Sequence, residues 1–167
     1  MFKRFLAFTL LIALSLGLAS PTFAQVPSPT PTPKIENVNS FELFWPMAPG
    51  KTMADSLYFL KSLKEKIRGL LIFGTPQKVN YSVYLSTKRI LEAEKLYNDK
   101  NKDLGNKTMD EAIKDLNKAV SQNSKGTDET SDRLARLDKF LTWFTTKNSA
   151  DKSKIQDALS LVKKLLG

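Results

Sequence analysis

The chain has 167 residues and contains neither cysteine nor histidine. The first absence excludes disulfide bonds and thiol nucleophiles, and the second excludes histidine-based nucleophilic systems. Together they remove most zinc, copper and iron sites, because these metals are bound mainly through thiolate and imidazole. The aspartates and glutamates fall at expected helix-capping positions or on helix faces of mixed charge. The sequence therefore predicts a protein that is not an enzyme and has no cofactor, and it nominates no catalytic, cofactor-binding or metal-binding residue.

A phosphate-binding loop is also lacking, although Gly50-Lys51-Thr52 resembles the end of one. The motif requires a glycine five positions before the Gly-Lys pair, and Trp45 occupies that position. No strand is predicted before it. We therefore predict no nucleotide partner.

The segment 99–110 resembles a calcium-binding loop, but the pattern is incomplete. Oxygen-bearing side chains occupy its positions 1, 3, 5 and 12, namely Asp99, Asn101, Asp103 and Asp110. Position 6 requires glycine, however, and is Leu104. Thr108 and Glu111 have the spacing of a capping box, so a polar turn followed by a helix start explains the segment better.

The first 24 residues have the features of a secretory signal peptide. Two basic residues, Lys3 and Arg4, precede a 15-residue apolar run, and small residues precede a cleavage site between Ala24 and Gln25. A helix of this run is about 22 Å long, shorter than the roughly 30 Å hydrocarbon core of a bilayer. We expect a cleaved signal and an extracytoplasmic protein, secreted or associated with the envelope. The alternative is an uncleaved N-terminal membrane anchor.

Residues 25–40 form a spacer rich in Pro, Ser and Thr, which we expect to be extended because proline fixes φ and lacks an N–H. The helical domain is expected over 41–167. From residue 25 onward the chain has 24 basic and 17 acidic residues, a net charge of +7. This balance suits an anionic envelope polymer, lipid head groups or an acidic protein. Export argues against nucleic acid.

Apolar residues recur at intervals of three and four in five segments, as in amphipathic helices. The first helix, 55–73, is expected to be capped by Asp55, or by Thr52 with Asp55, and to stop at Gly74. The second starts with Thr75 and Pro76 and includes 79–85, which alternates like a strand but has helical flanks. The other three are expected from Thr108 onward, around 134–144 and around 155–166. The sequence thus predicts an all-α fold, a small antiparallel bundle of about five helices.

The helix at 55–73 has two interpretations. Its apolar stripe, opposite Lys61, Lys64 and Arg68, is typical of a helix that lies on a membrane. It is also typical of a helix that packs into a core, and we predict the core because so small a domain needs its apolar stripes. Before it, Phe41, Phe44 and Trp45 are expected to cover the end of the bundle.

Three segments, "PG", "DSLYFLKSLKEKIRGLL" and "STKRILEAEKL", carry a resemblance to a known family. Together they resemble the bacterial domain of unknown function 5667, whose members are exported helical proteins. The resemblance covers residues 41–98 and implies export and a helix pair, but no activity. Its matching positions are Pro49, Gly50, Asp55, Leu57, Tyr58, Leu60, Lys61, Arg89, Glu92 and Ala93. The structural motif that we expect there consists of Trp45, Pro49, Gly50, Asp55, Leu57, Tyr58 and Arg89.

We predict an exported, non-enzymatic helical module that binds or scaffolds at the cell envelope through a basic surface. The expected contact residues lie on the first and last helices: Lys61, Lys64, Arg68, Lys163 and Lys164. One alternative is a helical-hairpin scaffold for a protein partner, since residues 104–120 look like part of a tetratricopeptide-type pair. Another is a periplasm-type holding chaperone, which requires an exposed apolar concavity.

Overall fold

The computed structural model describes residues 37–147 and 150–167. The predicted signal peptide, its cleavage site and residues 25–36 of the spacer lie outside the described residues. The compact unit runs from Ile35 to Gly167. Residues 37–40, predicted as the end of the spacer, belong to this unit, because Val38 is buried in the core and Ser40 begins a helix.

The described residues form six helices and no strand. They are α2 (Ser40–Phe44), α3 (Tyr58–Leu70), α4 (Thr75–Asn98), α5 (Lys102–Ser121), α6 (Asp128–Phe144) and α7 (Lys152–Leu166). The all-α prediction is confirmed, and the short α2 is an addition to the five predicted helices.

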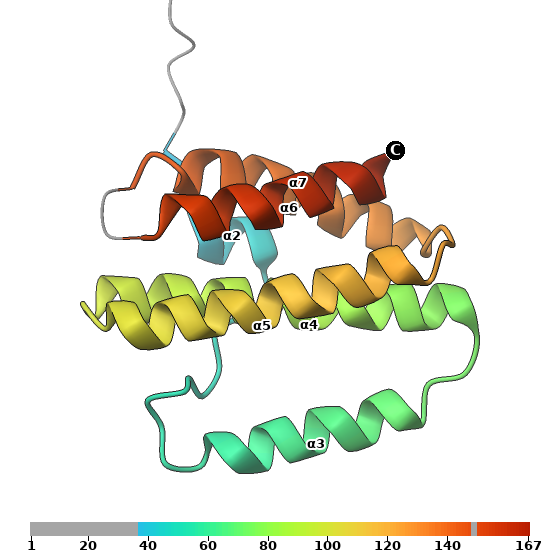
Figure 1. Cartoon of the computed structure of the whole chain (residues 1–167), viewed down its shortest axis with the longest axis horizontal. Helices are drawn as coiled ribbons and strands as arrows, with labels where there is room; N and C mark the ends of the chain where they lie inside the picture. Colours follow the sequence, from blue (N-terminus) through green and yellow to red (C-terminus); the bar gives the residue numbers. More distant parts are fainter. Residues whose placement is uncertain (1–36, 148–149) are drawn as a thin grey trace, which may run out of the picture. The chain divides into compact units, whose positions relative to one another are not determined.

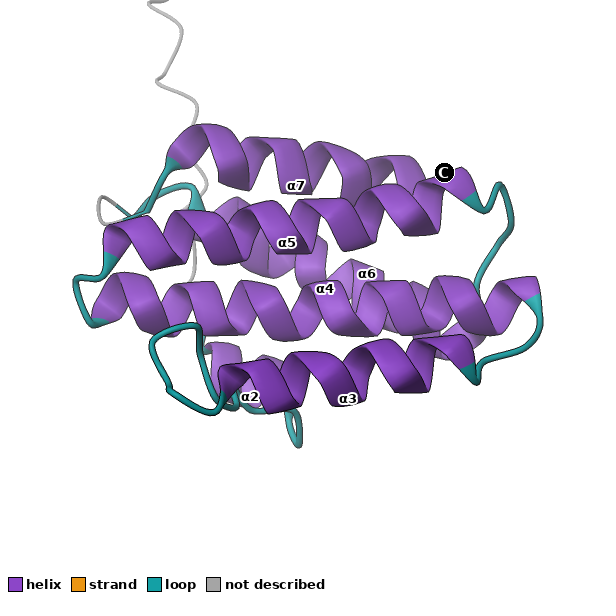
Figure 2. Ribbon diagram, turned by 60° about the horizontal axis from the view of Figure 1, so that its bottom comes forward, coloured by secondary structure: helices purple, strands orange, loops and turns teal. Residues whose placement is uncertain are grey.

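Two antiparallel hairpins, α4–α5 and α6–α7, stack on one another (Figure 1). The stacking places α5 against α7 and α4 against α6, and α2 contacts α6. Helix α3 lies on the far side of the α4–α5 hairpin from α6 and α7, as the second view also shows (Figure 2). The fold thus has three layers, and α3 is the outermost element on one side.

The core lies among α4, α5, α6 and α7, where apolar side chains from all four helices meet. An aromatic cluster fills one end of it, and Phe140 is at its centre, with ring centroids 5.8 Å from Phe44 and 5.2 Å from Phe144. Helices α4 and α5 approach closely at Gly105, where an added Cβ would lie 2.7 Å from the Tyr97 ring. The core therefore forms without any contribution from α3, none of whose residues is buried.

The second and fifth predicted helices are confirmed as α4 and α7. Residues 79–85 lie inside α4, and the β-branched residues Val79 and Val83 pack into the core. The prediction for the third helix was wrong at its start. Asn101 caps α5, so Thr108 lies in the helix interior, where its hydroxyl donates to the Leu104 carbonyl at 2.7 Å. The would-be calcium positions Asp103 and Asp110 are consequently helical.

Candidate interaction surface on helix α3

A tight turn leads into α3 and is closed by Asp55. Its carboxylate accepts hydrogen bonds from the Thr52 backbone N–H at 2.6 Å and from the Thr52 hydroxyl at 3.0 Å. These bonds, the backbone one first, lower the pKa of Asp55. The predicted pairing of Thr52 with Asp55 is present, but it closes the turn, and the helix begins three residues later at Tyr58. Gly50 and Lys51 therefore form part of a connection and not of a phosphate loop.

A second turn ends α3 and starts α4. Gly74 adopts φ +87°, which side chains rarely allow, and it occupies the N-cap position of α4. Thr75 and Pro76 follow as the first two helical residues, so the helix begins one residue earlier than the prediction, in which Thr75 was the cap and Pro76 the first helical residue. The two turns hold α3 alongside α4 (Figure 2).

The side of α3 that faces the bundle is charged. Lys61 forms an ion pair with Glu92 of α4, whose side chain is fully buried, and also donates to the Lys51 carbonyl at 2.9 Å. Lys61 and Glu92 belong to the two halves of the motif that resembles the family. That motif therefore describes, at these positions, an intramolecular contact between α3 and α4.

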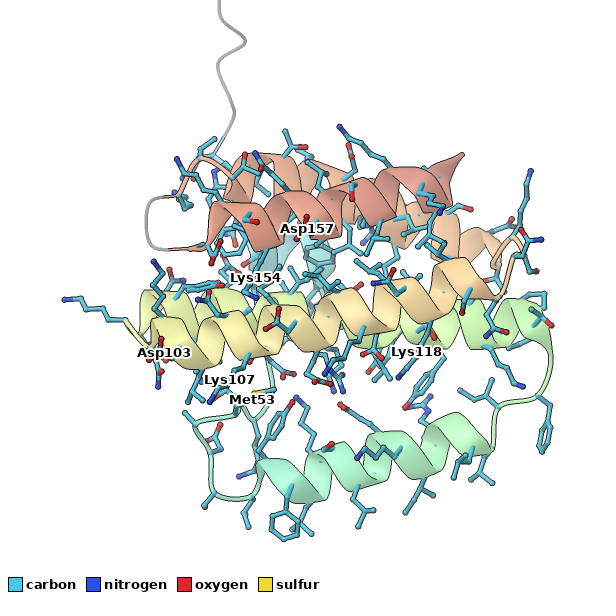
Figure 3. The ribbon with its side chains drawn as sticks, in the orientation of Figure 1. Met53, Asp103, Lys107, Lys118, Lys154 and Asp157 are labelled. Carbon is cyan, nitrogen blue, oxygen red and sulfur yellow. The ribbon has the colours of Figure 1, made fainter. Side chains whose placement is uncertain are left out.

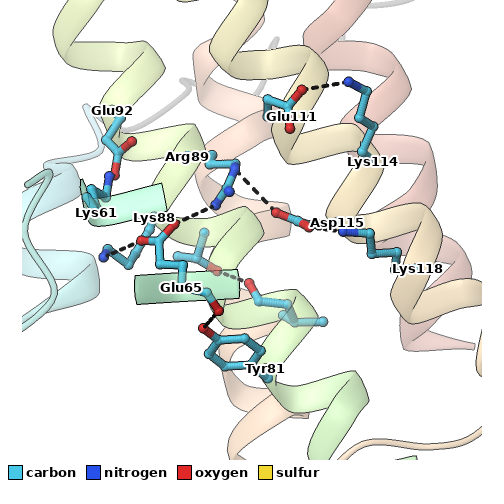
Figure 4. Close-up of polar contacts among 12 residues, drawn as sticks. Lys61, Glu65, Tyr81, Lys88, Arg89, Glu92, Glu111, Lys114, Asp115 and Lys118 are labelled. Atoms are coloured by element: carbon cyan, nitrogen blue, oxygen red, sulfur yellow. Dashed lines mark hydrogen bonds and ion pairs between the residues drawn. The ribbon is translucent and has the colours of Figure 1, made fainter. Parts of the chain in front are cut away.

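Glu65 is the centre of a larger network beneath α3 (Figure 4). Its carboxylate lies 3.1 Å from the Lys88 ammonium and 3.4 Å from the Arg89 guanidinium. Arg89 continues to Asp115 of α5 at 3.3 Å, and Asp115 continues to Lys118 at 3.1 Å. A continuous series of ion pairs thereby joins α3, α4 and α5.

Burial governs the protonation of this network. Desolvation raises the pKa of Glu92, against the effect of Lys61, and it raises the pKa of Asp115 against the effect of Arg89. One oxygen of Glu92, Oε2, is buried and accepts no hydrogen bond from the described residues. Burial lowers the pKa of Arg89, but Asp115 and then Glu65 raise it to a value above the ordinary one.

Two tyrosines line the same interface. The Tyr81 hydroxyl donates to the Glu65 carbonyl at 2.8 Å, and the Arg68 guanidinium lies 5.7 Å from the centre of the Tyr81 ring. Tyr58 is half-buried beside Lys61, and desolvation raises its pKa to about 12. Polar and aromatic contacts, in place of apolar packing, therefore hold α3 to the bundle.

The apolar side of α3 faces outward, which corrects the prediction that it packs into the core. Leu63 and Ile67 are each 52% exposed, and Leu70 is 80% exposed. The side chains on the outer side of the helix point away from the bundle (Figure 3). The physical reason is the charged surface of α4 and α5, because desolvated ions need partners of opposite charge that leucine does not provide.

Cations remain exposed on α3 beside this apolar stripe. Lys64, Lys66 and Arg68 are exposed, whereas Glu65, the only acid of the helix, points into the network. Among the described residues, neither Lys64 nor Lys66 has an ion-pair partner. The outer side of α3 is therefore both apolar and purely cationic.

The predicted basic surface is divided by the structure. Lys61 points into the bundle, while Lys64 and Arg68 are exposed on α3. Lys163 and Lys164 are exposed on α7, which lies on the opposite side of the α4–α5 hairpin (Figure 1). The five residues do not share one surface, and Lys66 joins the part on α3. The sequence pattern places Lys66 at the edge of the apolar stripe of α3. It could be recognised as a surface residue of interest only once the stripe was known to face outward.

The segment before α3 covers the core only in part. Phe44 is buried, but Trp45 is 63% exposed and packs edge-on against the exposed Phe41. Pro49 and Gly50 follow in the connection, and Leu57 is the exposed N-cap of α3. The prediction that all three aromatic residues cover the bundle was wrong for Phe41 and Trp45.

A groove of about 610 Å³ lies between α3 and the α4–α5 hairpin. Its lining has side chains of both signs, including Glu65, Arg89, Asp115 and Lys118. Lys118 lies on the side of α5 that faces α3 (Figure 3). No cluster of three or more acidic residues that could hold a metal ion occurs in the described part of the chain.

Within residues 37–147 and 150–167, every helix is too short or too polar to cross a membrane. The fold and the surface together define a small all-α module with an amphipathic helix on its outside, whose apolar side faces away from the bundle. The chain belongs to the family described as domain of unknown function (DUF5667), which it matches over residues 51–164. The match runs from the connection before α3 into the last turn of α7, and so extends well past the C-terminal limit of the predicted range 41–98. It begins ten residues later than predicted, so Pro49 and Gly50 lie outside it. No curated protein and no solved structure matches the chain significantly.

Proposed function

We propose that the protein is an exported, non-enzymatic module that binds at the cell envelope through the basic outer side of α3. One observation carries the proposal: the single acid of α3 points inward, so that Lys64 and Lys66 are exposed on the outer side without an ion-pair partner among the described residues. Arg68 is exposed as well, but its guanidinium lies toward the Tyr81 ring. A surface of this kind attracts anionic envelope polymers or lipid head groups. The expected export rests on the signal-like residues 1–24.

The test is retention on anionic envelope material at low and high salt. The chain from residue 25 onward contains the whole compact unit and is suitable for it. Binding is expected at low salt and should be lost at about 0.5 M salt, where the screening length is only a few ångströms. The double variant Lys64→Glu, Lys66→Glu should lose binding.

A matched control is provided by the opposite side of the protein. The variant Lys163→Glu, Lys164→Glu makes the same change in net charge on α7 and should keep its binding. Equal losses in the two variants would show that net charge, and not the surface of α3, determines binding. No salt-sensitive binding by the unaltered chain would contradict the proposal.

A second candidate function is a scaffold or holding chaperone for another protein. The exposed apolar side chains of α3 favour it, because a large exposed apolar patch marks an interaction site. It differs from the first in its salt dependence, since apolar contact with a protein partner should survive high salt.

A further inference from the structure

Helix α3 has an apolar arc with cations along both of its edges. With about 100° of rotation per residue, Phe59, Leu63, Ile67, Leu60 and Leu70 fall within an arc of roughly 120°. Lys66 lies just beyond one edge of this arc, and Lys64 lies just beyond the other. The structure agrees, since each of these side chains is exposed.

The charges at the edges select an occupant for the arc. Lysine at the edge of an apolar face can extend its ammonium group to phosphate while its methylene groups contact acyl chains. The exposed aromatic residues Phe59 and Phe73 lie at the two ends of the helix region, and Phe73 is 82% exposed. An anionic bilayer offers an apolar layer beneath negative head groups, in the same order as the arc and its edges.

A second copy of the chain is a poorer fit. Two α3 helices packed through their arcs would bring the Lys64 and Lys66 side chains of one copy against those of the other. No exposed acid on α3 is available to neutralise them. Like charges at an interface oppose association.

The position of α3 suits a flat surface. It is the outermost layer on its side of the fold, and the other labelled helices all lie on its opposite side, above it in Figure 1. A helix of 13 residues is about 20 Å long, enough to lie in the plane of a membrane but not to cross it. Contact with a bilayer needs no rearrangement of the core, to which α3 contributes nothing.

We propose that α3 binds the surface of anionic bilayers, with its axis in the membrane plane and its Leu63–Ile67 side inserted among the acyl chains. This inference rests on the proposed function, because it uses the same outer side of α3, and it adds the identity of the ligand. In this arrangement the ion-pair network between α3 and the bundle has a structural role. The network fixes the polar side of α3 to the bundle and thereby presents the apolar side outward.

Vesicles test the inference directly. The chain from residue 25 onward should bind vesicles of equal parts phosphatidylglycerol and phosphatidylcholine, and it should bind pure phosphatidylcholine much more weakly. Leu63→Ser with Ile67→Ser should reduce binding by about tenfold or more. Lys64→Gln and Lys66→Gln should each reduce it by about fivefold. The control Phe41→Ser with Leu166→Ser, which removes exposed apolar side chains away from α3, should leave it unchanged.

The absence of cysteine permits a second readout of depth. A nitroxide attached to Leu63→Cys should become inaccessible to water-soluble paramagnetic relaxation agents when anionic vesicles are added. The same label on Leu166→Cys, on α7, should stay accessible.

The outcomes separate this inference from the proposed function. Salt-sensitive binding to envelope polymer, with no vesicle binding and a label at position 63 that stays in water, would overturn the inference alone. No binding to any anionic material would overturn both. A stable dimer that Leu63→Ser with Ile67→Ser dissociates, or a purified protein partner seated on α3 in place of lipid, would also overturn the inference.

Discussion

The two sides of helix α4 offer a direct comparison. Toward α5 and α6 it presents apolar residues such as Val83 and Ile90, which are fully buried in the core. Toward α3 it presents Lys88, Arg89 and Glu92, which are paired with charges. The first interface depends on the hydrophobic effect, and the second depends on ion pairs whose benefit is largely offset by desolvation. We therefore expect the bundle to be much more stable than the attachment of α3.

The largest expected effect concerns the core. Phe140→Ala should lower the free energy of unfolding by about 3–5 kcal/mol, because it leaves a cavity within the aromatic cluster. Leu63→Ala on the outer side of α3 should change it by less than about 0.5 kcal/mol. Both values come from chemical denaturation. A loss of 2 kcal/mol or more in Leu63→Ala, on the scale of a buried leucine, would show that this face is covered in solution.

A smaller effect is expected when the network under α3 is weakened. Glu65→Gln should lower the free energy of local opening of α3 by about 1–2 kcal/mol and leave global unfolding nearly unchanged. The loss stays below the value for fully buried pairs because a lifted α3 returns Lys88 and Arg89 to water.

Amide hydrogen exchange of residues 58–70 measures this opening. Glu111→Gln is the matched control, since it removes the same charge from an exposed pair with Lys114 and should change exchange by less than about 0.5 kcal/mol. Slower or equal exchange in Glu65→Gln would contradict the assignment of Glu65 as the attachment of α3.

A third prediction uses two tyrosines to compare the two interfaces. Tyr58 beneath α3 and Tyr97 in the core both have pKa values raised to about 12, in each case chiefly by burial. In Glu65→Gln the pKa of Tyr58 should fall toward the ordinary value of 10, while that of Tyr97 stays at about 12. Because both folded pKa values are raised, the stability they contribute is lost as the pH rises from about 10 through 12.

Absorbance titration measures this difference, and Tyr58→Phe identifies the contribution of Tyr58. A parallel fall of both pKa values would show that α3 and the bundle open as one unit.

The sequence was sufficient for most of the helices and insufficient for two features. Apolar periodicity located α4, α6 and α7, since each buries the stripe that the pattern indicates. For α5 the local signals misled, because Gly105 looked like part of a turn, whereas in the fold it permits close packing on Tyr97. Tertiary packing thus extends α5 back to Asn101, beyond the capping-box pattern at Thr108.

The orientation of α3 shows a more general limit. Periodicity locates the apolar and the charged side of a helix, but it does not say which side meets the rest of the protein. Here the answer depends on Arg89, Glu92 and Asp115, which come from two other helices. The candidate surface follows from that orientation, so the sequence identified Lys64 and Arg68 but combined them with Lys163 and Lys164 on another side.

The smallest expected effect is a pH dependence in the attachment of α3. Burial raises the pKa of Glu92 above its ordinary value of 4.5, although Lys61 acts in the opposite direction. A carboxyl whose folded pKa is raised stabilises the fold below its unfolded pKa, and this contribution is lost as the pH rises through the folded pKa. The free energy of local opening of α3 in Glu92→Gln, which cannot ionise, should therefore increase relative to the unaltered chain from pH 4 upward. Amide hydrogen exchange of residues 58–70 at pH 4 and pH 7 measures the difference. If the unaltered chain is instead stabilised relative to Glu92→Gln as the pH rises, the ion pair with Lys61 outweighs the cost of desolvation. The contact between α3 and α4 would then be stronger than the comparison with the apolar core implies.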